Sequence, residues 1–277
     1  MSWTPEQRRR YAPAINAAVR ANATVRLAAT IDVIDLPART GRPRLWSTLT
    51  MVRALWWLCR AGAAWALLPN SCPPRQTIGS RLERWVRLGV LDRALDRALA
   101  VLNACLRLAR GRNRQPSAGI LDTQSVRTGP QAGPRGYDAN KKINGRKRVL
   151  LADTEGLLQA LRVVPASVQD RDTPVLIEPE LAAGNLRKVW ADLAFAGERA
   201  AAPLARRRID LELVGRRDKT GFAVEPRRWK IEQTFGCLQR YRRLLVDHEG
   251  STAMSRTMSL LAALSMTGAR FERQIVG

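Results

Sequence analysis

Three acidic residues in the second half of the chain have the types and positions that chemistry at phosphorus requires. Asp122 ends the short apolar run "AGIL", and Asp192 follows "RKVWA", so the pattern predicts that each acid leaves a buried strand. Glu232 lies within a predicted helix, beside the apolar face on which Ile231 and Phe235 recur. Carboxylate oxygens are the ligands that magnesium prefers, and two magnesium ions about 3.5–4 Å apart can bind the attacking and leaving oxygens of a displacement at phosphorus.

Each acid also has a structural interpretation, which the residues alone leave open. An Asp at the end of a strand often caps a helix or forms a turn. A Glu inside a helix often pairs with a basic residue one turn away, and Arg228 stands four residues before Glu232. The rest of the composition favours carboxylate chemistry, because the single histidine, His248, excludes an ordinary zinc site and argues against Ser-His-Asp catalysis.

The chain carries a large excess of positive charge. Its 277 residues include 47 Lys and Arg against 24 Asp and Glu, a formal net charge of +23, and 45% are hydrophobic, which is enough for a folded core. This charge favours a polyanionic partner, above all nucleic acid, although a basic surface without a binding role remains open. The opening "MSWTPEQRRRY" lacks the apolar core of a signal peptide, the apolar runs are too short to span a membrane, and the four cysteines are scattered. We therefore expect a cytoplasmic protein.

The first part of the chain has the periodicity of helices, with apolar residues at three- and four-residue steps. Helices are expected over these segments: 13–22, 47–59, 75–88 and 91–106. Prolines and a compact turn separate them, as in helix-turn-helix modules that bind DNA. Arg75, Arg81 and Arg84 lie in the third segment, where they either contact phosphates or form a solvated face. The basic sequence "RLARGRNRQPS", 107–117, is then expected to be a linker.

After Ala118 the pattern changes to strands that alternate with helices, which describes a mixed α/β domain. A first strand ends at Asp122, and a hairpin follows it, with strands near 148–152 and 157–164 joined by a turn at 153–156. The later segments are a helix at 173–183, a strand in "LRKVWADLAF", a helix in "ERAAAPLARRR", a strand in "IDLELVGRR" and a helix in "PRRWKIEQTFGCLQRYRRLL". We therefore divide the chain into a helical region, residues 1–115, and an α/β domain, residues 116–277.

Long motifs extend over about residues 45–245. They are "CRAGAAWALLPNSCPPRQTIGSRLERW", 59–85; "DTQSVRTGPQAGPRGYDANKKINGRKRVLLADTEGLL", 122–158; "VVPASVQDRDT", 163–173; "VWADLAFAG", 189–197; and "PRRWKIEQTFGCLQRYRRL", 226–244. In content and order they resemble bacterial insertion-sequence transposases of the Asp-Asp-Glu type, in the IS-five-like group. The resemblance implies an RNase H-like catalytic domain, with a mixed and mostly five-stranded sheet flanked by helices, preceded by a helix-turn-helix-like DNA-binding region.

The resemblance implies that Asp122, Asp192 and Glu232 form a catalytic triad that binds two Mg²⁺ ions, with Mn²⁺ as a substitute. It also matches Arg228 to the Arg-x-x-x-Glu signature of the family, and we expect this side chain at the DNA backbone near the scissile phosphate. A basic segment between the first two strands is expected to bind DNA through these residues: Arg135, Lys141, Lys142, Arg146, Lys147 and Arg148.

The sequence departs from the family's pattern in three places. Ala194 and Phe195 stand where the family usually has Gly-Tyr, Val149 replaces a common His, and Gln239 replaces a basic residue that some relatives carry. All three acids are nevertheless present, so an active enzyme is favoured and a decayed copy remains open.

The implied function is DNA transposition by two-metal phosphoryl transfer. Such an enzyme binds the terminal inverted repeats of an insertion sequence, cleaves at the element ends and joins the 3′ ends to target DNA. We expect it to act as a homodimer or higher oligomer on DNA, in the bacterial cytoplasm with the nucleoid and without a membrane partner. Two other classes remain open: a non-catalytic DNA-binding protein, as a decayed transposase or a regulator, and a nuclease of the same fold.

Overall fold

The computed structural model describes residues 18–35, 44–130, 133–215 and 229–275. Helices precede the sheet: α2 (Ala18–Ile34), α3 (Thr48–Ala61), the 3-10 turn η1 (Trp65–Leu67), α4 (Arg75–Arg87) and α5 (Val90–Leu108). Helices α3, α4 and α5 confirm the three long segments predicted from periodicity. The shorter prediction ends too early, because α2 continues through Asn22 to Ile34, and the beginning of that predicted segment lies outside the described residues.

Local signals in the sequence set both ends of α3. The Ser47 hydroxyl accepts a hydrogen bond from the Thr50 amide at 3.2 Å, which satisfies one of the unpaired amides at the helix start. Gly62 ends the helix with φ 65°, and its amide donates to the Leu58 carbonyl. A Cβ at Gly62 would also meet the Cβ of Arg242 at 2.6 Å, so glycine allows a distant segment to approach this helix end.

Within the described residues, six strands form one mixed sheet. They are β1 (Ala118–Arg127), β2 (Gly136–Asp138), β3 (Ile143–Asp153), β4 (Leu158–Pro165), β5 (Lys188–Ala191) and β6 (Asp210–Leu213). Strand β1 lies in the middle, antiparallel to β3 and parallel to β5, and β6 extends the sheet parallel to β5. Strands β2 and β4 pair with different parts of the same edge of β3, so the six strands occupy five positions across the sheet. This order confirms the RNase H-like arrangement and the β3–β4 hairpin.

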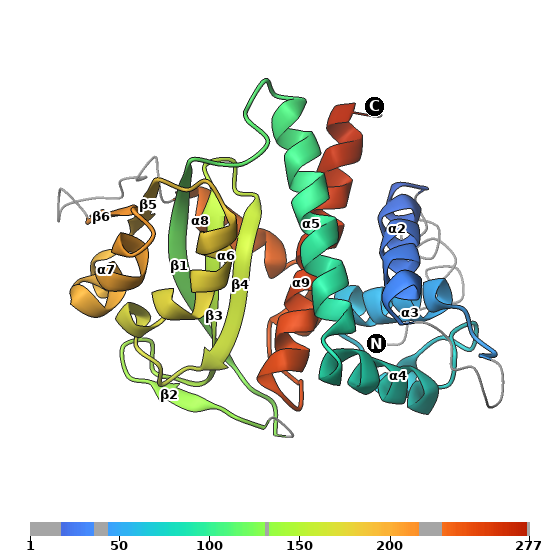
Figure 1. Ribbon diagram of the computed structural model, residues 1–277. Helices are drawn as coiled ribbons and strands as arrows, with labels where there is room; N and C mark the ends of the chain where they lie inside the picture. The colour runs from blue at the N-terminus through green and yellow to red at the C-terminus, as the bar shows by residue number, and fades with distance from the viewer. Residues whose placement is uncertain (1–17, 36–43, 131–132, 216–228, 276–277) are drawn as a thin grey trace.

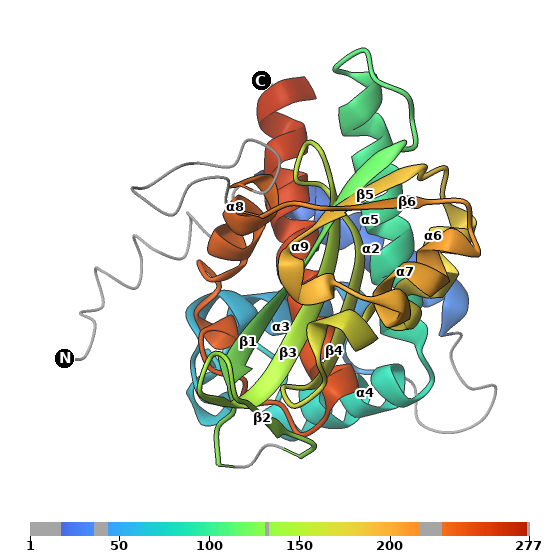
Figure 2. The same ribbon diagram turned by 90° about the vertical axis from the view of Figure 1, so that its left-hand side faces the viewer.

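Helices cover both faces of the sheet. The later elements are the short turns η2 (Asp170–Asp172), η3 (Pro174–Ile177), η4 (Leu193–Phe195) and η5 (Arg242–Leu244), and helices α6 (Glu178–Ala183), α7 (Glu198–Ala205), α8 (Trp229–Leu238) and α9 (Thr252–Ile275). In Figure 1 the sheet stands between α7 on one side and α9 with α5 on the other, and α2, α3 and α4 lie beyond. Figure 2 looks onto the sheet from the side of α6 and α7. Among the described helices, none combines the length and apolar character needed to cross a membrane.

Alternate side chains of each strand enter different cores. Ile120 and Leu150 belong to the larger core, which also contains buried side chains of the first helices, α8 and α9. Leu121 and Val149, one position away in each strand, belong to a smaller core with α6 and α7. The side chain on one strand position therefore faces α8 and α9, and its neighbour faces α6 and α7.

The C-terminal helix α9 was not predicted from the sequence. It packs against α5, α2 and α3 on one side and against β4 on the other, so its apolar residues are buried around more than one face. Buried Ser255, Thr257 and Ser259 also interrupt the run of apolar residues by which a core-facing helix is identified. The larger core runs through α9 from the first helices to the sheet. The domain boundary at residues 115 and 116 stays a prediction, although the core does not divide there.

A buried ion pair joins the sheet to the segment that precedes α9. Arg146 of β3 is 0% exposed and Asp247 is 2% exposed, and Nη1 of Arg146 donates to Oδ1 of Asp247 at 3.0 Å. The other carboxylate oxygen of Asp247 accepts from the Ser255 hydroxyl of α9 at 2.5 Å. The backbone of Asp247 also exchanges hydrogen bonds with the end of β1, from its amide to Arg127 and from the Gly129 amide to its carbonyl. One residue thereby fixes the start of α9 to both β1 and β3.

A second buried arginine of β3 reinforces this junction. Arg148 donates to the Leu244 carbonyl at 2.9 Å and to Oε1 of Gln124 at 3.3 Å. Burial lowers the pKa of Arg148 to about 10, although the charge of Asp247 opposes the shift. Close by, Arg243 donates to Glu249 at 2.6 Å, and both side chains are buried. Charged pairs therefore fill the space between the sheet and the segment that joins α8 to α9.

The first prediction concerns the stability of this junction. Asp247→Asn should lower the free energy of unfolding by about 3–5 kcal/mol, because it removes the charge partner of a buried guanidinium and leaves Arg146 uncompensated. Urea denaturation followed by tryptophan fluorescence measures the change.

Glu178→Gln is the matched control. It also removes the carboxylate partner of an arginine, Arg206 at 3.0 Å, but that guanidinium is more than half exposed. The control should unfold at the urea concentration of the wild type, because water replaces the lost partner. Equal urea midpoints for wild type, Asp247→Asn and Glu178→Gln would show that the buried pair does not hold the fold together.

Candidate active site

Asp122 lies in the middle of β1, so the expected strand exit is wrong for this acid. The strand continues to Arg127, because the residues after Asp122 keep pairing with β3. Asp122 is paired with Leu150, a residue of the larger core, so its side chain points to the sheet face that α8 and α9 cover. Its Oδ1 accepts a hydrogen bond from the Thr123 amide at 2.7 Å, which orients the carboxylate.

Asp192 directly follows β5, as predicted. Its Oδ1 accepts a hydrogen bond from the Ala194 amide at 3.0 Å, so the acid also caps the turn η4. Strands β1 and β5 are parallel, and Ile120 is paired with Trp190. Asp122 and Asp192 are separated by the same 70 residues as this pair (192 − 122 and 190 − 120), so the register extended by two residues makes them neighbours. The parallel pairing therefore supports the prediction that these two acids, distant in the sequence, lie close together.

Glu232 lies in the first turn of α8, on its exposed side. The buried side chains of Ile231, Phe235 and Leu238 pack α8 into the larger core, over the face of β1 and β3 to which Asp122 points. The helix ends at Leu238, earlier than the sequence pattern indicated. Arg228, which the family resemblance placed beside Glu232, lies outside the described residues.

The chemistry of this donor set fits a divalent metal, because all three residues offer carboxylate oxygens from elements that meet on one face of the sheet. In the part of the chain that the structure describes, no group of three or more His, Cys, Asp or Glu side chains has the geometry of a metal site. The structure pairs β1 with β5 as far as Ile120 and Trp190, two residues before the two aspartates, and puts the glutamate on a helix over the same face. Shared metal binding by the three stays a prediction.

Half of the basic segment lies inside the protein. Arg146, Lys147 and Arg148 are 0%, 4% and 0% exposed, because β3 begins at Ile143, earlier than expected, and places them in a strand covered on both faces. Lys147 donates to Asp170 at 2.6 Å, while Arg146 and Arg148 bind the segment before α9. These three side chains thus stabilise the fold and present no surface to DNA. The other members of the segment, Arg135, Lys141 and Lys142, are exposed.

The arginines of α4 differ in a similar way. Arg75 is exposed at the start of the helix, whereas Arg81 and Arg84 each contact the buried carboxylate of Asp35 at 3.3 Å. Burial acts to raise the pKa of Asp35, but the hydrogen bond from Trp85 and the neighbouring arginines outweigh it and hold the pKa below its usual range. Part of the positive charge of α4 therefore compensates an internal acid.

One acid near Asp122 was missed by sequence reasoning. Asp170 of η2 accepts hydrogen bonds from the Thr123 hydroxyl at 2.8 Å and from Lys147 at 2.6 Å. Lys141 donates to the Thr123 carbonyl at 3.1 Å, so both the side chain and the backbone of Thr123 are hydrogen-bonded. Asp170 is a positioning residue for the strand that carries Asp122. Its signal was present in the motif "VVPASVQDRDT", to whose aspartates no role was assigned.

The positions that depart from the family's pattern are accommodated in the fold. Phe195 and Val149 are both 0% exposed and belong to the smaller core, so each of these side chains packs among apolar neighbours. Gln239 follows the end of α8 and is exposed.

Comparisons with known proteins agree with this arrangement. The family described as "Transposase DDE domain" matches residues 113–267, which is more than half of the chain and includes the whole sheet, α8 and the three acids. The family described as "Putative transposase of IS4/5 family" matches residues 26–95, which include α3 and α4. A search of curated proteins found no match. The chain therefore belongs to the transposase DDE domain family and is a transposase of the IS4/IS5 type.

Proposed function

We propose that this transposase binds the terminal inverted repeats of an insertion sequence, cleaves DNA at the element ends and joins the 3′ ends to target DNA. The observation that carries the proposal is the parallel register of β1 and β5, because its continuation beyond Ile120 and Trp190 would make Asp122 and Asp192 neighbours. Glu232 supplies the third carboxylate from the helix over the same sheet face. The net charge of +23 and the family support DNA as the substrate.

Asp122, Asp192 and Glu232 would hold two Mg²⁺ ions, or Mn²⁺ in their place, because both ions accept carboxylate oxygens. When bound, such ions lower the pKa of a water molecule and stabilise the charge on the attacking and leaving oxygens. The chain itself orients the ligands, since the amides of Thr123 and Ala194 each donate to one carboxylate.

Both reactions of the proposed enzyme are displacements at phosphorus. In cleavage, the oxygen of water forms a bond to phosphorus and the bond to the 3′ oxygen of the element end breaks, which leaves a 3′ hydroxyl and a 5′ phosphate. In joining, that 3′ oxygen bonds to a phosphorus of target DNA, and the 3′ oxygen of the target leaves. Each step replaces one phosphorus–oxygen bond with another, so no external energy source is required.

Exposed basic side chains on two parts of the molecule would bind the DNA backbone. Arg75 and the half-exposed Arg84 lie on α4, while Arg135 and Lys142 lie beside β2. Arg81 pairs with Asp35 and is mostly buried, so it is left out of this surface. Arg228 carries over from the family signature as a contact near the scissile phosphate. Cleavage at two ends favours a homodimer or higher oligomer on DNA, in the cytoplasm with the nucleoid.

A non-catalytic DNA-binding protein, as a regulator or a decayed transposase, is the second candidate function. It is favoured by one observation, namely that no metal-binding group of side chains is assembled among the described residues. A nuclease of the same fold would cleave DNA but would not join its 3′ ends to a target. Cleavage and joining assays therefore separate the three functions.

The second prediction separates catalysis from binding. Asp192→Asn keeps the size and the capping ability of the side chain but removes the charge that a metal ion needs. In the presence of Mg²⁺, cleavage of a DNA end should fall by several orders of magnitude, and chelation of the metal should abolish wild-type cleavage. In metal-free buffer the variant should bind the same DNA at least as well as the wild type, because phosphates are bound by Lys and Arg.

Asp210→Asn is the control for this experiment. It removes the same charge from β6, at a side chain that is 66% exposed and pairs with Lys188. We expect wild-type cleavage for this variant. If Asp192→Asn instead cleaves DNA at nearly the wild-type rate, Asp192 has no role in catalysis and serves only as the cap of η4.

The third prediction concerns α4. Arg75→Ala and Arg84→Ala should each reduce the slope of log affinity against log salt by about one, because each variant loses one phosphate contact. Arg81→Ala, whose side chain is only 15% exposed and contacts Asp35, should mainly lower the urea midpoint of unfolding. Unchanged salt slopes for Arg75→Ala and Arg84→Ala would remove α4 from the DNA-binding surface.

A further inference from the structure

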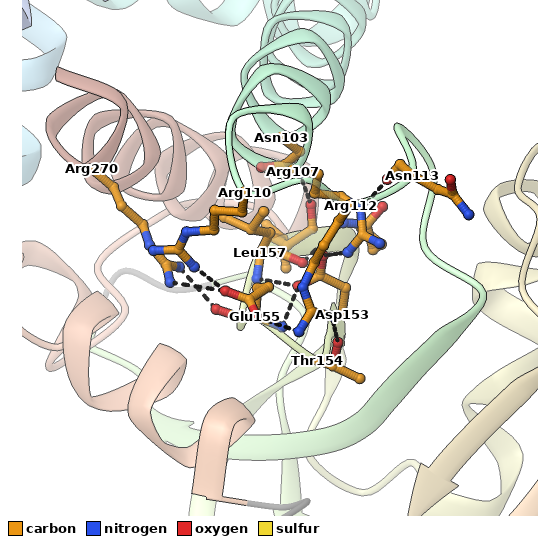
Figure 3. Close-up of polar contacts among 12 residues, drawn as sticks. Asn103, Arg107, Arg110, Arg112, Asn113, Asp153, Thr154, Glu155, Leu157 and Arg270 are labelled. Carbon is orange, nitrogen blue, oxygen red and sulfur yellow. Dashed lines mark hydrogen bonds and ion pairs between the residues drawn. The ribbon is translucent and has the colours of Figure 1, made fainter. Parts of the chain in front are cut away.

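The basic segment 107–117, expected to be a linker, folds over the turn between β3 and β4 (Figure 3). Arginines from this segment, from the end of α5 and from α9 meet the two acids of the turn, Asp153 and Glu155. The arrangement has an inner and an outer part with different accessibility.

The inner part is buried and balanced in charge. Asp153 is 0% exposed, and its carboxylate accepts from Arg107 at 2.5 Å and from the amides of Glu155 and Leu157 at 2.8 and 2.9 Å. Asn103 of α5 donates to the Leu158 carbonyl at 2.6 Å. These bonds dock α5 on the hairpin, so the inner part is fully accounted for by the fold.

The outer part has more positive charge than the fold needs. Three arginines lie around the single carboxylate of Glu155: Arg110 contacts Oε2, Arg112 lies 3.2 Å from Oε1, and Arg270 lies 3.9 Å from Oε2. Arg270 also donates to the backbone carbonyl of Glu155 at 2.9 Å. The three arginine side chains are 30%, 47% and 26% exposed, so each still faces solvent. Exposed ion pairs contribute little to stability, so stability alone does not explain why three guanidiniums gather here.

The like charges in this cluster repel one another. Burial lowers the pKa of Arg270, and the neighbouring charges of Arg110 and Arg273 lower it further, while Glu155 opposes the shift. An additional anion placed between these guanidiniums would relieve the repulsion. Guanidinium groups bind phosphate oxygens in pairs of parallel hydrogen bonds, which makes a phosphodiester a suitable anion.

The cluster borders the candidate active site. Gly156, next to Glu155, accepts a hydrogen bond from the Thr234 hydroxyl of α8 at 3.1 Å. A Cβ at Gly156 would lie 3.3 Å from the Lys230 carbonyl, so the turn touches the first turn of α8, where Glu232 is placed. Nucleic acid that reaches Glu232 would therefore have the arginine cluster beside it.

We propose that Arg110, Arg112 and Arg270 form a binding site for the phosphate backbone of duplex DNA next to the candidate active site. Glu155 holds the three guanidiniums together in the free protein and competes with phosphate for them. The proposal rests on DNA as the substrate of the proposed function but not on cleavage by the three acids. It assigns the basic segment 107–117 a role in binding.

Glu155→Gln tests the competition. The variant should bind a duplex of unrelated sequence several-fold more tightly than the wild type, because the guanidiniums lose the carboxylate that competes with phosphate. Glu178→Gln is the matched control: it makes the same change of charge at an acid that Arg206 and Arg207 contact, beside the smaller core on the other face of the sheet. Equal affinity of the two variants would overturn the proposal, because it would reduce the effect to net charge.

A second pair of variants measures the contacts themselves. Arg112→Gln with Arg270→Gln should reduce the salt slope of duplex binding by about two, while Arg206→Gln with Arg207→Gln should leave it unchanged. An equal slope for both pairs would contradict the site. Cleavage assays with Mg²⁺ on the same proteins keep the two proposals distinct. If Arg112→Gln with Arg270→Gln reduces the salt slope but the wild-type protein does not cleave DNA, the proposed enzyme is contradicted. If the wild-type protein cleaves DNA but the variant keeps the wild-type salt slope, the arginine site is contradicted.

Discussion

The buried ion pair between Arg146 and Asp247 is the constraint on which the position of the candidate active site depends. A charge buried without a partner costs several kcal/mol, so β3 retains its arginines only while the segment that joins α8 to α9 stays against the sheet. That segment follows the helix of Glu232, and its start is further held by Arg148 at the Leu244 carbonyl. The pair therefore links the strand pairing of β1 and β3 to the placement of the third acid. Its role is structural, although its residues occur in a segment whose basic character suggested DNA binding.

The excess positive charge of the protein is divided between two uses. Inside, Arg107, Arg146 and Arg148 compensate buried acids or carbonyls and have almost no exposed surface. At the surface, exposed cations lie on α4, beside β2 and around the β3–β4 turn. Their positive electrostatic potential attracts phosphates. The two uses meet in the β3–β4 turn. Asp153 there is buried and paired with Arg107, whereas Glu155 lies among partly exposed arginines. This separation explains how one residue type both stabilises the core and forms the proposed DNA surface.

The sequence predicted the helices α3, α4 and α5 and most of the strands, because amphipathic periodicity and turn residues are local signals. It did not reveal α9, in which Ser255, Thr257 and Ser259 are buried together with the apolar residues. Asp122 was expected at a strand end, but pairing with β3 extends β1 beyond it, and pairing between distant strands is not encoded locally. The exposure of Arg81 and Arg146 was misjudged for the same reason, since their acidic partners come from elsewhere in the fold. The family resemblance implied that Asp122 and Asp192 act together, and the β1–β5 register, which pairs Ile120 with Trp190, supports this proposal.

Whether Asp122, Asp192 and Glu232 bind metal ions together is tested most directly by a crystal structure with Mn²⁺ and a DNA end. Anomalous scattering locates the manganese ions independently of the protein coordinates. We expect two anomalous peaks about 3.5–4 Å apart, with carboxylate oxygens of the three acids as ligands. Peaks bound to other residues, or a Glu232 side chain that remains turned to solvent while the two aspartates hold the metal, would contradict it.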